Sequence, residues 1–296
     1  IRRPDGYCGK LPELGTDVFA MDTGNSNADQ AFTSGFPVDF AFNRQPATAS
    51  QYQWEVGARL MQGKLLYTWK TDAEISYSDG KFDDNTGWLP NNGYTSNWQS
   101  WMWKRHAGFD VVTYEGNSNN TDGANAHRHS LAKPPEMIWI KARSGGTYSG
   151  VTHWSMSHKG LNGGTNPWQY TMQLNLTDTK AATSNFGNTA PTSEVFYVGE
   201  PGNARTNHAS TQYLAMLFAS TDVSAVGSYT GNGDGSSGIT VTTGFQPRFL
   251  IIKRADGTGD WFVMDSLRGM SNSGDEKILR LNSNVAQVSD NIGDTS

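Results

Sequence analysis

The sequence predicts an all-β protein made of tandem β-sandwich (jelly-roll-like) domains. Short runs of β-branched and aromatic residues alternate with clusters of Gly, Asn, Asp and Pro, a pattern typical of sandwiches and barrels. One arrangement of residues also recurs three times at a spacing of roughly 100 residues, far longer than the period of a solenoid. Together these observations indicate copies of one all-β domain along the chain.

Each copy of the repeat begins with a Gly-Asn pair that follows a short hydrophobic stretch. A proline then precedes an apolar run that ends in a basic or polar residue, and a tryptophan and a glycine follow. The corresponding residues are Gly24, Gly116 and Gly231; Pro37, Pro135 and Pro247; Trp54, Trp154 and Trp261; and Gly63, Gly160 and Gly269. We therefore divide the chain into an N-terminal segment (1–12) and three sandwich repeats (13–107, 108–222 and 223–296), called copies 1, 2 and 3.

Copy 2 has the clearest strands, each short, rich in β-branched or aromatic residues and bounded by turn residues. Residues 137–140 are apolar without alternation, which predicts a central strand covered on both faces. Residues 170–176 alternate, which predicts a strand with one face in water. The predicted strands are 109–115, 136–142, 151–157, 169–176, 194–198 and 212–218.

Copy 3 reaches Ser296 without any counterpart of residues 194–218, so its last two strands are missing from this sequence. Either the native chain continues, or another segment completes that sandwich.

Apolar residues at repeated positions predict the cores of the copies. We expect Phe40, Ile138 and Leu250 to occupy equivalent buried strand positions, and the three repeated tryptophans to anchor the cores. Trp101 and Trp103 align with the apolar Met216 and Phe218 of copy 2. We therefore interpret these two tryptophans, and Trp98 near them, as core residues and not as a platform for sugar stacking.

Composition excludes several classes of protein. The net charge is −5 and no large Lys/Arg cluster occurs, which argues against a nucleic-acid partner. No apolar run approaches the ~18 residues of a membrane-spanning helix, so we expect no membrane insertion. Cys8 is the single cysteine, so no internal disulfide can form.

Two stretches carry a resemblance to a known family. Residues 244–269 read Gly-Phe-x-Pro-x-Phe-Leu-Ile-Ile-Lys-Arg and then Asp-Trp-Phe-Val-Met-Asp-Ser-Leu-Arg-Gly, and residues 196–233 join copy 2 to copy 3. Both resemble the tandem-repeat domains in tail-fibre and other virion proteins of tailed bacteriophages, especially marine and cyanobacterial ones. Copy 1 departs from this pattern, because Trp54 is followed by Glu-Val-Gly-Ala-Arg-Leu and not by an Asp-Ser-x-Arg-Gly turn.

The resemblance implies a structural protein on the exterior of the phage particle, in the tail region. It implies homo-oligomers such as trimers, bound to other virion proteins, and it carries over no catalytic residue. We therefore expect a non-enzymatic virion protein, part of a tail fibre or a similar host-attachment appendage. The alternatives are a carbohydrate-binding or adhesin module at the host surface and a polysaccharide-degrading tailspike.

Few residues suggest a site. His127 and His129 share one face of a strand, but no Cys or acidic ligand follows at a zinc spacing, so we expect no metal and no cofactor. Asp83-Asp84 and Asn232-Gly233-Asp234 are typical of tight turns, with calcium binding as the alternative. No Gly-x-Ser-x-Gly or His-Glu-x-x-His motif predicts catalysis.

Two aromatic residues are candidates for contact with a carbohydrate or receptor. Tyr148 and Trp168 lie in Gly-, Asn- and Ser-rich insertions that only copy 2 contains. An exposed aromatic ring on a polar loop suits a glycan or protein contact. The sequence therefore predicts that both rings face solvent.

Overall fold

In their described residues, copies 1 and 2 of the repeat each contain eight strands in the same order. The computed structural model describes residues 11–290 except 28, 50–53, 78–79, 91–92, 145–151, 200–205, 235–236 and 271–274. Copy 1 consists of β1 (Phe19–Thr23), β2 (Phe32–Thr33), β3 (Phe40–Arg44), β4 (Glu55–Ala58), β5 (Lys64–Tyr67), β6 (Ile75–Ser76), β7 (Gly87–Trp88) and β8 (Gln99–Trp103). Copy 2 consists of β9 (Phe109–Glu115), β10 (Asn125–Arg128), β11 (Met137–Ala142), β12 (Ser155–His158), β13 (Tyr170–Gln173), β14 (Ala181–Ala182), β15 (Val195–Val198) and β16 (Gln212–Phe218).

Copy 3 has four strands in the described residues, the counterparts of β3 to β6. They are β17 (Phe249–Lys253), β18 (Trp261–Asp265), β19 (Glu276–Arg280) and β20 (Val288–Asp290). The described part of the chain also contains three short 3-10 turns: η1 (Gly15–Asp17), η2 (Leu161–Gly164) and η3 (Pro167–Gln169). No helix in the described part of the chain is long and apolar enough to span a membrane.

Each of copies 1 and 2 is a two-layer sandwich. The large sheets have the antiparallel strand orders β1-β8-β3-β4-β5-β6 and β9-β16-β11-β12-β13-β14. The remaining strands pair as two-stranded ribbons, β2 with β7 and β10 with β15. Apolar side chains such as Trp88 in copy 1 and Phe196 in copy 2 fill the space between sheet and ribbon. The predicted all-β sandwich class is therefore confirmed.

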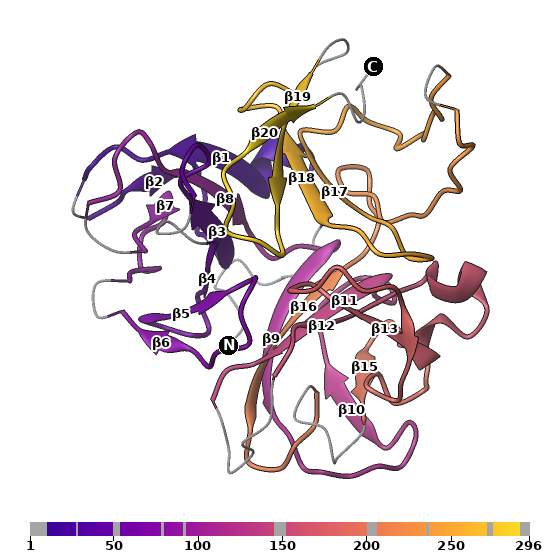
Figure 1. The fold of residues 1–296 in the computed structure, drawn as a ribbon. Helices are drawn as coiled ribbons and strands as arrows, with labels where there is room; N and C mark the ends of the chain where they lie inside the picture. Colours follow the sequence, from indigo (N-terminus) through magenta and orange to yellow (C-terminus); the bar gives the residue numbers. More distant parts are fainter. Residues whose placement is uncertain are drawn as a thin grey trace.

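The three large sheets also share one hydrophobic core. Figure 1 shows copy 1 (indigo and purple) at the left, copy 2 (magenta to orange) below and copy 3 (yellow) above, around a common centre. The core cluster contains Phe42 and Trp101 of copy 1, Trp139 of copy 2, and Val263 and Leu279 of copy 3. The copies thus surround one axis instead of following one another in a row, an arrangement that the repeat pattern did not predict.

The strands after the repeated prolines correspond in a register that differs from the prediction by one residue. Phe40, Met137 and Phe249 occupy the same position in their strands. Each pairs with the residue that lies four places after the repeated tryptophan of its copy. All three pack on the shared core. Ile138 and Leu250 instead face the outer clusters of their copies, so their predicted equivalence to Phe40 is wrong. Side chains alternate along a strand, and a shift of one residue therefore moves them to the opposite face.

The predicted burial of the aromatic residues is confirmed. Trp54, Trp154 and Trp261 expose 0%, 0% and 2% of their surface. Trp101 and Trp103 pair with β3 in the same register as Met216 and Phe218 pair with β11. All four side chains pack on the shared core. Trp98 is buried in the outer cluster of copy 1.

Most of the strands predicted for copy 2 are present, with shifted ends. The strand predicted at 169–176 is β13, which ends at Gln173, and the one predicted at 194–198 is β15. Strands β10 and β14 were not predicted, because β10 is polar and β14 is only two residues long.

Candidate functional site

The repeated tryptophans join the copies to one another. Each indole N–H donates a hydrogen bond to a backbone carbonyl of another copy. The bonds run from Trp54 to Arg280 (2.8 Å), from Trp154 to Tyr67 (2.9 Å) and from Trp261 to Gln173 (3.0 Å). Copy 1 therefore binds copy 3, copy 2 binds copy 1 and copy 3 binds copy 2, which closes a ring. Buried indole N–H groups normally have such an acceptor.

A second ring is formed by the basic residue near the end of each apolar run. Arg44, Lys141 and Lys253 occupy equivalent positions in β3, β11 and β17. Each lies four residues after the equivalent residues Phe40, Met137 and Phe249. Each cation donates to a carbonyl of another copy: Arg44 to Val285 (2.8 Å), Lys141 to Thr71 (3.1 Å) and Lys253 to Thr177 (3.3 Å). The basic residues at the ends of the apolar runs thus form contacts between copies.

Two of these cations have no solvent exposure. Arg44 and Lys141 are each 0% exposed, and Arg44 lies over the ring of Trp54 at 5.1 Å. Burial removes the hydration that favours the charged form, so it lowers the pKa of Lys141 to about 7 and that of Arg44 to about 10. The ammonium of Lys141 also donates to the carbonyl and hydroxyl oxygens of Thr152, at 2.9 Å each.

The Asp-Ser-x-Arg-Gly turn of copy 3 forms a contact with copy 1. The carboxylate of Asp265 accepts hydrogen bonds from the indole of Trp101 (3.0 Å) and from the guanidinium of Arg268 (2.6 Å). The Arg268 group lies 5.6 Å from the centre of the Trp101 ring. Gly269 closes the turn with a φ of +107°, a conformation that favours glycine. In copy 1 the turn lacks this acid, and Ala58 stands at the position of Asp265.

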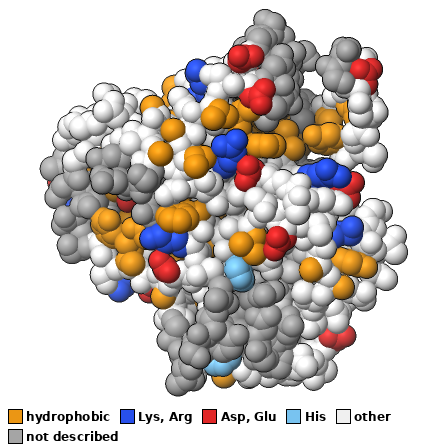
Figure 2. Space-filling view, viewed as in Figure 1, with side chains coloured by type: hydrophobic (Ala, Val, Ile, Leu, Met, Phe, Trp, Pro, Cys, Tyr) orange, Lys and Arg blue, Asp and Glu red, His pale blue; other side chains and the backbone are white. Residues whose placement is uncertain are grey.

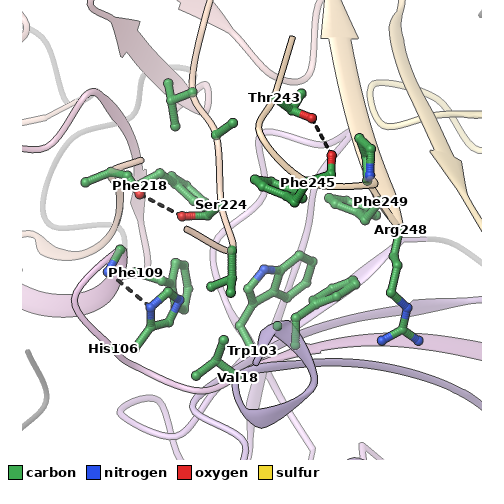
Figure 3. A pocket seen from close by; sticks show the side chains of 18 of the residues that line it. Val18, Trp103, His106, Phe109, Phe218, Ser224, Thr243, Phe245, Arg248 and Phe249 are labelled. Carbon is green, nitrogen blue, oxygen red and sulfur yellow. Dashed lines mark hydrogen bonds between the residues drawn. The ribbon is translucent and has the colours of Figure 1, made fainter. Parts of the chain in front are cut away.

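A cavity of about 450 Å³ lies at one end of the shared core, where the three copies meet (Figure 3). The aromatic rings of Trp103, Phe109, Phe218 and Phe249 point towards it, and Phe40 also lines it. The segments 222–226 and 243–248 close its other side. An apolar cavity of only ~150 Å³ can bind a benzene-sized guest, so this one has room for large apolar side chains.

A histidine lies in the lining of this cavity. Nδ1 of His106 accepts the N–H of Gly108 at 3.1 Å (Figure 3). Burial, with a smaller contribution from Lys104, lowers the pKa of His106 to about 4. The imidazole is therefore neutral at pH 7, and the part of the cavity beside it suits apolar groups.

The lining of the cavity contains two of three equivalent aromatic positions. Trp103 ends β8 and pairs with Phe40, and Phe218 ends β16 and pairs with Met137. In copy 3, Phe249 corresponds to the pairing partners Phe40 and Met137. No strand in the described residues pairs with β17 on that side, so Phe249 has no aromatic residue opposite it there. The cavity lies against Phe249, at the place where a third aromatic side chain would complete the set.

One of the two predicted contact residues, Trp168, lies in the described part of the chain, whereas Tyr148 lies outside it. Trp168 is 7% exposed and packs with Phe186 at a ring distance of 6.4 Å, so the expectation that its ring faces solvent is wrong. Pro167 begins the short turn η3, which places the next side chain in the outer cluster of copy 2. Polar neighbours in the sequence gave no sign of this burial.

The histidines and acidic loops have structural partners. The ring of His127 packs against that of Tyr114, with the ring centres 4.1 Å apart and the planes tilted by 32°, and Nε2 of His129 lies 3.0 Å from the carbonyl of Thr192. Asp84 accepts the N–H of Thr86 at 2.6 Å in a tight turn. Within the described residues, no group of three His, Cys, Asp or Glu side chains is arranged to hold a metal ion.

Fold and contacts define an all-β protein whose three repeat copies surround a shared core and are joined by two rings of contacts. Residues 19–295 match the model of a family described as a domain of unknown function, DUF7483, and the chain belongs to this family. No curated protein and no solved structure is significantly similar to it.

Proposed function

We propose that this chain is a non-enzymatic structural protein of a bacteriophage particle, part of a tail fibre or a similar host-attachment appendage. The resemblance of residues 244–269 to tail-fibre repeats supports the proposal. The observation that carries it is the use of the repeated side chains: Trp54, Trp154 and Trp261 all serve to join the copies. Residues that recur for packing suit a protein that builds a rigid body.

The same geometry supports a role in attachment. A shared core fixes the three copies relative to one another, so the loops at the outer ends of the sandwiches keep fixed relative positions. Several weak contacts held in this way act at high effective concentration on a surface. The proposed partners are further copies of this chain, other virion proteins and a host surface glycan or protein, and the proposed location is the exterior of the tail.

The carbohydrate-binding alternative has lost one of its two aromatic candidates. Trp168 is buried, so it cannot stack on a sugar without leaving its place beside Phe186. Tyr148, outside the described residues, remains the candidate for such a contact.

Incubating the purified chain with envelope polysaccharide of the host is expected to give binding at most, without release of reducing ends. A heat-unfolded sample of the chain serves as the control for non-specific binding. Release of reducing ends that is lost when one carboxylate is replaced would establish a depolymerase instead.

Antibody labelling of intact phage particles tests the structural role directly. We expect the label on the tail in electron micrographs, and the chain in purified particles at a fixed copy number. Its absence from washed particles would rule out the proposal.

A further inference from the structure

We propose that the free edge of β17 and the cavity beside it form a docking site for one added β-strand with large apolar side chains at alternate positions. This inference rests on the three-fold arrangement of the fold and does not depend on the proposed function. The added strand would be antiparallel to β17 and would complete the sheet of copy 3.

The first support is the place that β8 and β16 occupy in the other copies. β8 pairs with both β1 and β3, and β16 with both β9 and β11. β17 corresponds to β3 and β11, but in the described residues it pairs only with β18. An unpaired edge presents a row of N–H and C=O groups that an extended peptide can bind.

The second support is the incomplete burial of copy 3. All five residues of β3 are buried, whereas all five of β17 are only half-buried. Six of the nine large hydrophobic residues that are exposed in the described chain belong to copy 3: Tyr229, Ile239, Val241, Leu267, Val285 and Val288. Figure 2 shows hydrophobic side chains at the surface over the sheet of copy 3. Copy 3 therefore leaves more apolar surface uncovered than copies 1 and 2.

The registers of β8 and β16 define the side chains that the added strand needs. Trp103 and Phe218 lie opposite Phe40 and Met137, so the added strand places an aromatic ring opposite Phe249. Two residues earlier, opposite Ile251, it places a large apolar side chain, as Trp101 and Met216 do in the other copies. Both side chains would point into the shared core, where the cavity has room for them.

Arg248 adds a charge preference. In copies 1 and 2 the position of Arg248 is held by Asp39 and Glu136. Each of these carboxylates accepts a backbone N–H, at 2.7 Å, from the residue two places after the aromatic residue of the added strand's counterpart. The donors are Arg105, after Trp103, and Ser220, after Phe218. Copy 3 has an exposed arginine at this place, and Figure 3 shows its side chain directed away from the rings. The added strand therefore fits best with a carboxylate at that position.

The occupant is a strand other than those already in this fold. β8 and β16 each lie between two strands of their own sheet, so a second copy of the chain could donate one only by breaking that sheet. The partner is thus an extended polypeptide segment in which an apolar residue, an aromatic residue and an acidic residue follow one another at every second position.

A synthetic peptide tests the proposal. It carries the sequence of residues 211–219, followed by a glutamate, with terminal lysines for solubility. Its binding to the chain of residues 1–296 is measured by calorimetry. We expect saturable 1:1 binding and slower hydrogen exchange of the backbone amides of residues 248–253. A control peptide with the same residues, shifted so that the alternation falls on the other face, should not bind.

The predicted preference of Arg248 for a carboxylate in the peptide is tested by a second binding measurement. Replacing the peptide's glutamate by lysine should weaken binding about two- to fivefold, as for an exposed ion pair, and Arg248→Glu in the protein should reverse the order of the two peptides. No binding of either peptide, with the amides of β17 unchanged, would overturn the proposal. Dimers of the chain that protect β17 without peptide would assign the edge to a second copy and also overturn it.

Discussion

Trp154→Ala is expected to lower the free energy of unfolding by about 3–5 kcal/mol, in the range of large-to-small substitutions of buried aromatic residues. The side chain is 0% exposed and contributes to the core that all three copies share. Its loss also leaves the carbonyl of Tyr67 without the indole donor at 2.9 Å. Thermal and denaturant unfolding of the variant measure the effect.

Two further variants separate the causes. Trp154→Phe keeps most of the apolar contact but removes the N–H, and it should cost about 1–3 kcal/mol, the penalty of a buried carbonyl without a donor. Leu60→Ala, at a side chain that is 37% exposed, should change stability by less than about 0.5 kcal/mol. Because the core is shared, each variant should unfold in one transition; separate transitions for the copies would contradict the ring.

Lys141 is expected to make the protein more stable as the pH rises from 7 to 9. Burial lowers the pKa of this lysine to about 7 from its ordinary value of 10.5, so in this range the folded state loses a proton that the unfolded state keeps. Stability rises with pH wherever the unfolded state binds more protons. The expected gain between pH 7 and pH 9 is about 2 kcal/mol, since each unit of pKa difference corresponds to about 1.4 kcal/mol.

The variant Lys141→Met isolates this contribution from other titrating groups. It should remove the gain, and the difference in unfolding free energy between the two proteins should change with pH by the same ~2 kcal/mol. Lys277→Met, at an exposed lysine, should leave the pH dependence unchanged. A pH profile of Lys141→Met parallel to that of the original chain would show that Lys141 keeps its ordinary pKa when folded.

Particular residues show how far local pattern extends. The alternation of apolar residues predicted β13, and a short aromatic and apolar run bounded by turn residues predicted β16. The repeated tryptophans were predicted to be buried because a large aromatic residue at a fixed position in each copy serves packing. The equivalence of Phe40 with Ile138 failed, because counting from the prolines ignores the one-residue difference in the path that leads into β3 and β11. Trp168 failed because its polar sequence neighbours do not reveal the distant Phe186 against which it packs.

By itself the sequence determined the all-β class, the three copies and the buried tryptophans. The class follows from alternation and turn residues, which act within a few positions along the chain, and the copies follow from the recurrence of one pattern at a long spacing. Only the tertiary structure decided that the copies close around one core, that Arg44, Lys141 and Lys253 bind carbonyls of neighbouring copies, and that β17 has a free edge beside a cavity. Such contacts join residues of different copies, and no local pattern specifies which carbonyl a buried N–H group will reach.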